Sequence, residues 1–163
     1  MTRMSNQSQR QLLPPLIGLA WAALMFAGTA WAATYRVDDS ATMPRESSAA
    51  MKWSSPQGGR AEFNDIEGST TVQIRLNLTP WLKRNGRVFL VLPEQPGAPI
   101  NVSWTTQGRL LPGQLVSGQR ALVFSGPISV ERLDETMVLR IRTDGTRMTA
   151  AQRLNFHFEI DVD

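Results

Sequence analysis

The chain has 163 residues, with 17 Lys and Arg, 14 Asp and Glu, one His and no Cys. The lack of cysteine excludes disulfide bonds and cysteine nucleophiles, so a folded domain must depend on packing alone. Two basic residues, Arg3 and Arg10, stand near the amino terminus, and the rest of the chain is nearly neutral. This balance argues against nucleic-acid binding, which needs basic residues clustered on one face.

The first 32 residues have the pattern of a secretory signal peptide. A positively charged start precedes the apolar stretch LLPPLIGLAWAALMFAGTAWA, which closes on Ala30-Trp31-Ala32. We therefore expect residues 1–32 to be a signal peptide and residues 33–163 to be one exported domain, periplasmic or extracellular. The alternative is an uncleaved membrane anchor, because the apolar run approaches the roughly 20 residues of a spanning helix. Membrane contact is expected only through this segment, and only if it is not cleaved.

From residue 33 onward, apolar and polar residues alternate in short stretches that Gly, Pro and Asn separate. This is the pattern of half-buried strands joined by turns. The predicted strands, in chain order, are residues 34–37, 49–53, 70–78, 87–92, 100–104, 120–124, 135–142 and 153–163. They predict an all-β domain, an antiparallel β-sandwich that is immunoglobulin-like or jelly-roll-like.

Composition within this region refines the prediction. Residues 87–92, RVFLVL, are apolar on both faces, which predicts a central strand covered on each side. The charged segment VERLDETM, residues 130–137, is expected to be a solvated connector. Asn85-Gly86 is expected to be a turn. Residues 78–85 and 145–153 are the segments compatible with a short helical turn.

The titratable residues offer little for catalysis. His157 is the single histidine, and no G-x-S-x-G motif presents a serine. Paired carboxylates can hydrolyse glycosides, and the candidates are Asp38, Asp39, Glu131, Asp134 and Glu135. Acids adjacent in sequence on a strand point to opposite faces, which argues against such a pair. We therefore predict no enzymatic activity and no catalytic residue.

Metal ligands are equally sparse. NDIEG at residues 64–68 lacks the other ligands of a calcium-binding loop. The methionines after residue 32 are dispersed, whereas a copper carrier would group its thioethers. The prediction is no metal site and no cofactor.

Aromatic residues give the first binding hypothesis. Trp53, Trp81 and Trp104 remain after the predicted cleavage, and Trp104 shares one strand face with Ile100 and Val102, which predicts a place in the core. Trp81 follows Pro80 in a loop, and Trp53 closes a weak strand. Because an exposed ring can stack on the apolar surface of a sugar, we take Trp81 and Trp53 as candidate ligand-binding residues.

The terminal stretch RLNFHFEIDVD, residues 153–163, gives the second binding hypothesis. Its polar face consists of Asn155, His157, Glu159, Asp161 and Asp163. If this strand lies at a sheet edge, its free backbone can bind a strand of another protein, and the first four of these residues become a partner-binding strand. If it is an internal strand instead, it is expected to pair with residues 135–142.

That internal alternative has a defined register. Keeping both apolar faces together places Arg142 opposite Asn155 and Arg140 opposite His157. Arg140 is then diagonal to Glu159, an exposed contact that stabilises the fold by less than about 1 kcal/mol. His157 needs no catalytic role in this arrangement.

Together, these features predict an exported, cysteine-free β-sandwich of a bacterial cell envelope that acts as a non-enzymatic protein-interaction or structural and assembly module. Its expected partner is another envelope protein. The alternative is a carbohydrate- or small-ligand-binding domain that uses exposed tryptophans, with a polysaccharide as partner. A hydrolase that uses an acid pair is the third and weakest hypothesis.

Overall fold

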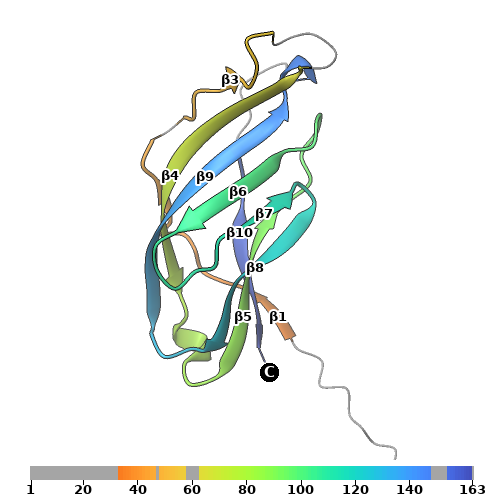
Figure 1. The fold of residues 1–163 in the computed structure, drawn as a ribbon. Coiled ribbons are helices and arrows are strands. Elements are labelled where there is room, and N and C mark those ends of the chain that lie inside the picture. The colour runs from red at the N-terminus through yellow and green to blue at the C-terminus, as the bar shows by residue number, and fades with distance from the viewer. Residues whose placement is uncertain (1–32, 47, 58–62, 148–153, 163) are drawn as a thin grey trace, which may run out of the picture. The chain divides into compact units, whose positions relative to one another are not determined.

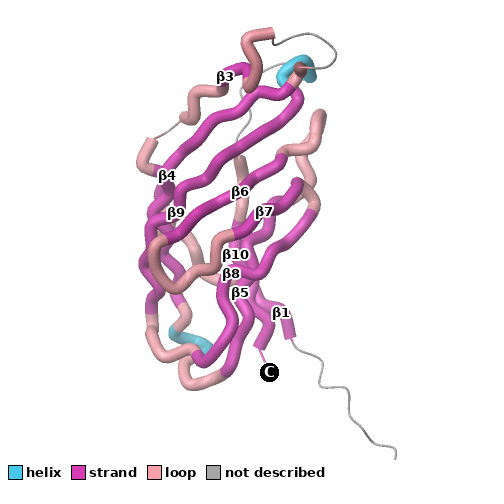
Figure 2. The backbone as a smooth tube through the Cα atoms, viewed as in Figure 1, coloured by secondary structure: helices cyan, strands magenta, loops and turns pink. Residues whose placement is uncertain are grey.

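The structure, a computed structural model, describes residues 33–46, 48–57, 63–147 and 154–162. The predicted signal peptide and residues 148–153 therefore lie outside the described residues. The described chain folds into two antiparallel sheets packed as a β-sandwich, which confirms the predicted fold class (Figure 1). Strands dominate, with two short 3-10 turns at Thr79–Trp81 and Gly145–Arg147 (Figure 2).

Sheet A has the strand order β1-β10-β5-β8, and sheet B has the order β2-β4-β9-β6-β7, with β3 also pairing with β4. The strands are β1 (Ala33–Arg36), β2 (Met43–Pro44), β3 (Lys52–Trp53), β4 (Asp65–Asn77), β5 (Asn85–Leu92), β6 (Asn101–Thr106), β7 (Gly113–Val116), β8 (Gln119–Pro127), β9 (Arg132–Asp144) and β10 (His157–Val162).

The core lies between the sheets, because each strand turns its apolar residues inward. Alternate residues of β4, Val72, Ile74 and Leu76, are buried as their sequence pattern predicts. From sheet A, Phe158 and Ile160 of β10 are fully buried against them. Burial of these side chains is the main stabilising contribution in a domain without disulfide bonds.

Strand β5 lies between β10 and β8, so residues 87–92 form an inner strand of sheet A as predicted. Their outward side chains, however, are only half-buried, and Phe89 and Val91 lie on the outer face. The strand begins at Asn85, so Asn85-Gly86 is not a turn. The reversal comes just before it, where Lys83 has a positive φ of 65°.

Strand β9 begins at Arg132, so the prediction of a solvated connector over residues 130–137 is wrong. Leu133 and Met137 are buried, and Glu135 between them is buried as well. A charged residue at an inward position interrupts the apolar alternation, which is why the sequence pattern hides this part of the strand.

The Glu135 carboxylate is satisfied by the loop between β6 and β7. It accepts hydrogen bonds from the backbone N–H groups of Gly108 at 2.9 Å, Arg109 at 2.9 Å and Leu110 at 3.0 Å. A Cβ atom on Gly108 would lie 2.8 Å from Glu135 Cδ, so only glycine allows this close approach. One carboxylate thus fixes the loop at this end of the sandwich.

The terminal strand β10 is internal to sheet A. It pairs with β1 on one side and with β5 on the other, and Ile160 lies opposite both Tyr35 and Val88. The prediction of a free backbone edge at this strand is therefore wrong, since neither side of its backbone is open to strand addition.

The register predicted between β10 and residues 135–142 is also wrong. Arg140 and Arg142 lie on β9, which pairs with β4 and β6 in sheet B. Strands that follow one another in sequence often pair, but the connection between β9 and β10 passes from one sheet to the other.

Replacing Glu135 by Ala is expected to lower the free energy of unfolding by about 2–4 kcal/mol, because three loop N–H groups lose their acceptor. Urea denaturation measures this loss. The control is Asp134→Ala on the same strand, whose ion-paired side chain is half-exposed and is expected to contribute less than about 1 kcal/mol. Equal losses in the two variants would contradict the structural role of Glu135.

Candidate functional site on the outer face of sheet A

The outer face of sheet A brings together polar and aromatic side chains from four strands. Because side chains alternate along a strand, every second residue points outward here. We call this surface the sheet A face; it consists of Thr34 and Arg36 of β1, His157, Glu159 and Asp161 of β10, Arg87, Phe89 and Val91 of β5, and Arg120 and Leu122 of β8.

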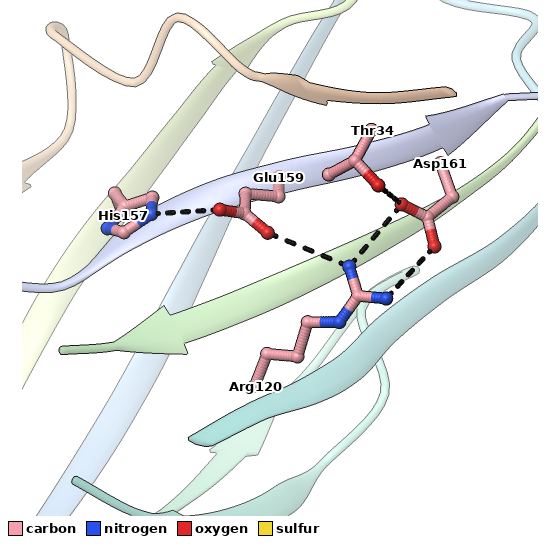
Figure 3. Close-up of polar contacts among 5 residues, drawn as sticks. All are labelled: Thr34, Arg120, His157, Glu159 and Asp161. Atoms are coloured by element: carbon pink, nitrogen blue, oxygen red, sulfur yellow. Dashed lines mark hydrogen bonds and ion pairs between the residues drawn. The ribbon is translucent and has the colours of Figure 1, made fainter. Parts of the chain in front are cut away.

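Arg120 crosses the central strand β5 to reach β10 (Figure 3). Its Nη1 and Nη2 atoms donate to Oδ1 and Oδ2 of Asp161 at 3.4 and 3.3 Å. Nη1 also lies 3.6 Å from Glu159 Oε2. The guanidinium carbon lies 4.2 Å from the centroid of the Phe89 ring, a cation–π contact. Two carboxylates and one ring therefore hold this side chain flat against the sheet.

Asp161 is the most buried charged group of the face, with 7% of its surface exposed. Thr34 Oγ1 donates to its Oδ1 at 2.6 Å. Burial has the largest single effect on the Asp161 pKa and raises it, but the hydrogen bonds from Thr34 and Arg120 and the charges of Arg120 and Arg87 together outweigh burial. The net result is a pKa lowered from the ordinary value of 3.8.

His157 lies at the other end of the same chain of contacts. Its Nε2 atom is 3.3 Å from Glu159 Oε1, and Glu159 in turn contacts Arg120. The hydroxyl of Thr34 donates its hydrogen bond to Asp161 and not to the His157 imidazole. Thr34 and His157 therefore do not form a nucleophile with its base. Of the predicted partner-binding residues, Asn155 precedes β10 and is exposed, while the other three share the sheet A face.

Three of the acids considered for hydrolysis, Asp38, Asp134 and Glu135, make other contacts. Asp134 points outward and pairs with Arg75 at 3.5 Å and with Arg132 at 3.6 Å, whereas Glu135 points inward to its loop. Asp38 accepts hydrogen bonds from the hydroxyl and the N–H of Ser40, which lower its pKa. Asp134 and Glu135 lie on opposite faces of β9 and therefore do not act together as an acid and its base.

Residues 64–68, considered as a calcium loop, mostly belong to β4, and Glu67 there pairs with Arg142 of β9. Within the described ranges, no three His, Cys, Asp or Glu residues lie close enough to hold a metal ion. No helix in the part of the chain that the structure covers is both long and apolar enough to cross a membrane.

The two candidate tryptophans have different surroundings. Trp81 is buried, with 8% of its surface exposed, and its ring packs at 6.1 Å from that of Tyr35. Its prediction as a ligand platform is wrong, because it closes the core at the 3-10 turn. Trp53 is 45% exposed, lies opposite Ile66 in the pairing of β3 with β4, and stays a candidate.

Sequence reasoning missed Arg120, Phe89 and Thr34. Each stands on a different strand from Asp161, and their sequence separations from it run from 41 for Arg120 to 127 for Thr34. An arginine at the second position of β8 and a threonine at the second position of β1 carry no local signal of this contact. Strand order in sheet A is what brings them to Asp161.

No protein-family model and no curated protein sequence matches the chain. A solved structure, that of TmCBM61 in complex with β-1,4-galactotriose, matches with 10% sequence identity and a TM-score of 0.25, over 74% of this chain and 82% of that chain. Similarity at this level carries no conclusion about the ligand or the family of this chain. The functional proposals therefore rest on contacts within the chain itself.

The lowered pKa of Asp161 predicts an acid-sensitive contribution to stability. Ionised Asp161 stabilises the fold fully above its unfolded pKa of 3.8, and this stabilisation is lost as the pH falls through its lower folded pKa. Asp161→Asn is expected to lower the free energy of unfolding by about 1–2 kcal/mol at neutral pH, because an aspartate pairs with Arg120 more strongly than an amide does.

The measurement is urea unfolding of wild type and Asp161→Asn across a pH series. The difference in unfolding free energy is expected to stay constant down to about pH 5 and to shrink at lower pH. A difference that grows on acidification would contradict the assignment.

Proposed function

We propose that the chain is an exported, non-enzymatic binding domain of a bacterial cell envelope, and that its sheet A face contacts another envelope protein. Export is supported by the signal-peptide pattern of residues 1–32. The observation that carries the binding proposal is the partly buried ion pair of Arg120 and Asp161, set beside half-buried Phe89 and exposed Leu122. Interface centres are enriched in aromatic residues and arginine, and Phe89 and Arg120 lie in contact on this face.

Ion pairs on the outer face of sheet B are of a different kind. Arg142 and Glu67 have side chains that are 54% and 43% exposed, and their nearest charged atoms are 3.6 Å apart. Such pairs are ordinary solvated contacts. On the sheet A face the side chains of Asp161 and Glu159 are only 8% and 27% exposed. A fixed polar network with apolar neighbours suits a preorganised contact surface better than a solvated one.

The proposal is tested by placing a photoreactive amino acid at position 122 or at position 138 and irradiating intact cells. Leu122 and Val138 are similarly exposed, at 38% and 43%, and lie on the outer faces of sheets A and B. We expect a defined protein adduct at position 122 and none at position 138. Adducts of equal yield at the two positions, or none at 122, would contradict the proposed face.

A second candidate function, carbohydrate binding, is favoured by Trp53. Two atoms of its six-membered ring lie 3.0 Å from the point where a Cβ on Gly145 would stand, so the glycine leaves room for the ring to lie against the 3-10 turn. The exposed side of the ring is accessible for stacking on the C–H surface of a sugar. Asp144, which precedes the turn at Gly145–Arg147, and Arg147, which ends it, form an ion pair with a 3.4 Å contact and can hydrogen-bond to hydroxyl groups.

Affinity electrophoresis in gels that contain different polysaccharides tests this candidate. Trp53→Ala is expected to weaken any retardation at least about fivefold, because the stacking surface is removed. Tyr35→Ala, which removes a similarly exposed aromatic ring of β1, serves as the control. Retardation that Tyr35→Ala lowers and Trp53→Ala does not would rule out the Trp53 surface.

A further inference from the structure

The sheet A face carries apolar side chains on its last two strands. Half-buried Phe89 of β5 lies opposite Leu122 of β8, which is exposed. We define the apolar strip as Phe89 and Leu122. It runs across the sheet and not along one strand.

The positive and negative side chains of the sheet A face differ in their exposure. Arg36, Arg87 and Arg120 are exposed, whereas the carboxylates of Glu159 and Asp161 are mostly covered. Arg36 lies opposite Glu159 in the pairing of β1 with β10, and Arg87 lies opposite Asp161 in the pairing of β10 with β5. A partner that approaches this surface therefore meets guanidinium groups before it meets carboxylates.

From these two features we propose that the sheet A face binds an acidic polypeptide surface that also carries apolar side chains. This proposal rests on the proposed function and specifies the partner's chemistry. Carboxylates of the partner complement the exposed arginines, which favour bidentate pairing. Apolar side chains of the partner cover the apolar strip, whose burial supplies affinity.

Charge alone does not single out this face. The outer face of sheet B also exposes arginines, among them Arg140 and Arg142, and the apolar side chains of Val138 and Met43. The residues opposite these apolar side chains are polar there: Thr71 and Thr105 lie opposite Val138, and Gln73 lies opposite Met43. A ligand that offers only negative charge, such as an anionic polysaccharide, would bind both faces. The apolar strip beside the arginines is what favours an acidic and apolar polypeptide on the sheet A face.

The experiment uses the purified protein and four probes: a random copolymer of glutamate and tyrosine, polyglutamate, dextran sulfate and phosphatidylglycerol vesicles. Binding is followed by titration calorimetry at two salt concentrations. We expect the copolymer to bind about tenfold more tightly than polyglutamate, and binding to weaken as salt rises. Binding to dextran sulfate or to the vesicles as tight as to the copolymer would overturn the proposal.

Matched variants locate the binding. Arg87→Glu and Leu122→Asp are expected to weaken copolymer binding at least about fivefold each. Arg140→Glu and Val138→Asp make the same changes on sheet B and are expected to change it less than about twofold. Equal losses on the two sheets would overturn the proposal. Arg36→Glu replaces Arg87→Glu if circular dichroism shows that the latter does not fold.

The remaining outcomes separate this proposal from the proposed function. A protein adduct at position 122 without copolymer binding would refute the acidic partner and retain the face as an interface. If there is neither a protein adduct at position 122 nor copolymer binding, both proposals fail. Concentration-dependent dimerisation that Leu122→Asp abolishes would assign the face to a second copy of the chain, and would also overturn the acidic partner.

Discussion

The pairing of β10 between β1 and β5 is the constraint on which the described structure most depends. Through this pairing β10, the last described strand, joins β1, the first described strand, in one sheet. The inward side chains Phe158 and Ile160 complete the core against sheet B. On the other side of the strand, Glu159 and Asp161 are carried to within reach of Arg120. A single strand thus supplies both the core and the polar network.

That position also explains why the two outer faces differ. In sheet B, ion pairs such as Arg75 with Asp134 join neighbouring strands and stay half-exposed, so each contributes little to stability. In sheet A, Arg120 reaches across β5 and covers Phe89 on the way. The carboxylates beneath it lose water contact and gain fixed donors instead, which is why the Asp161 pKa is lowered despite its burial.

Several residue types that suggest chemistry in a sequence are used by the fold itself. Glu135, one of the acids considered for hydrolysis, fixes a loop through three backbone N–H groups. Trp81, considered as a sugar platform, closes the core beside Tyr35. Both are buried near connections between strands, where orphaned backbone groups and open core ends need partners. Exposure, and not residue type, distinguishes Trp53 from Trp81.

The sequence by itself determined the fold class and most strands, because alternation over stretches such as residues 70–78 fixes which side chains face inward. It missed the start of β9, because the buried charge of Glu135 breaks the apolar pattern. It also placed His157, Glu159 and Asp161 correctly on one face of the terminal strand. It did not predict their partners Arg120 and Thr34, which lie on other strands.

Only the tertiary structure decided which strands are neighbours. Local alternation states which way a side chain points, but it carries no information on whether the next strand lies in the same sheet or in the opposite one. The predicted pairing of Arg140 with His157 failed for this reason, since β9 and β10 belong to different sheets. Arg120 meets Asp161 because the long-range order β10-β5-β8 places them together, and burial of apolar side chains across the whole core selects that order.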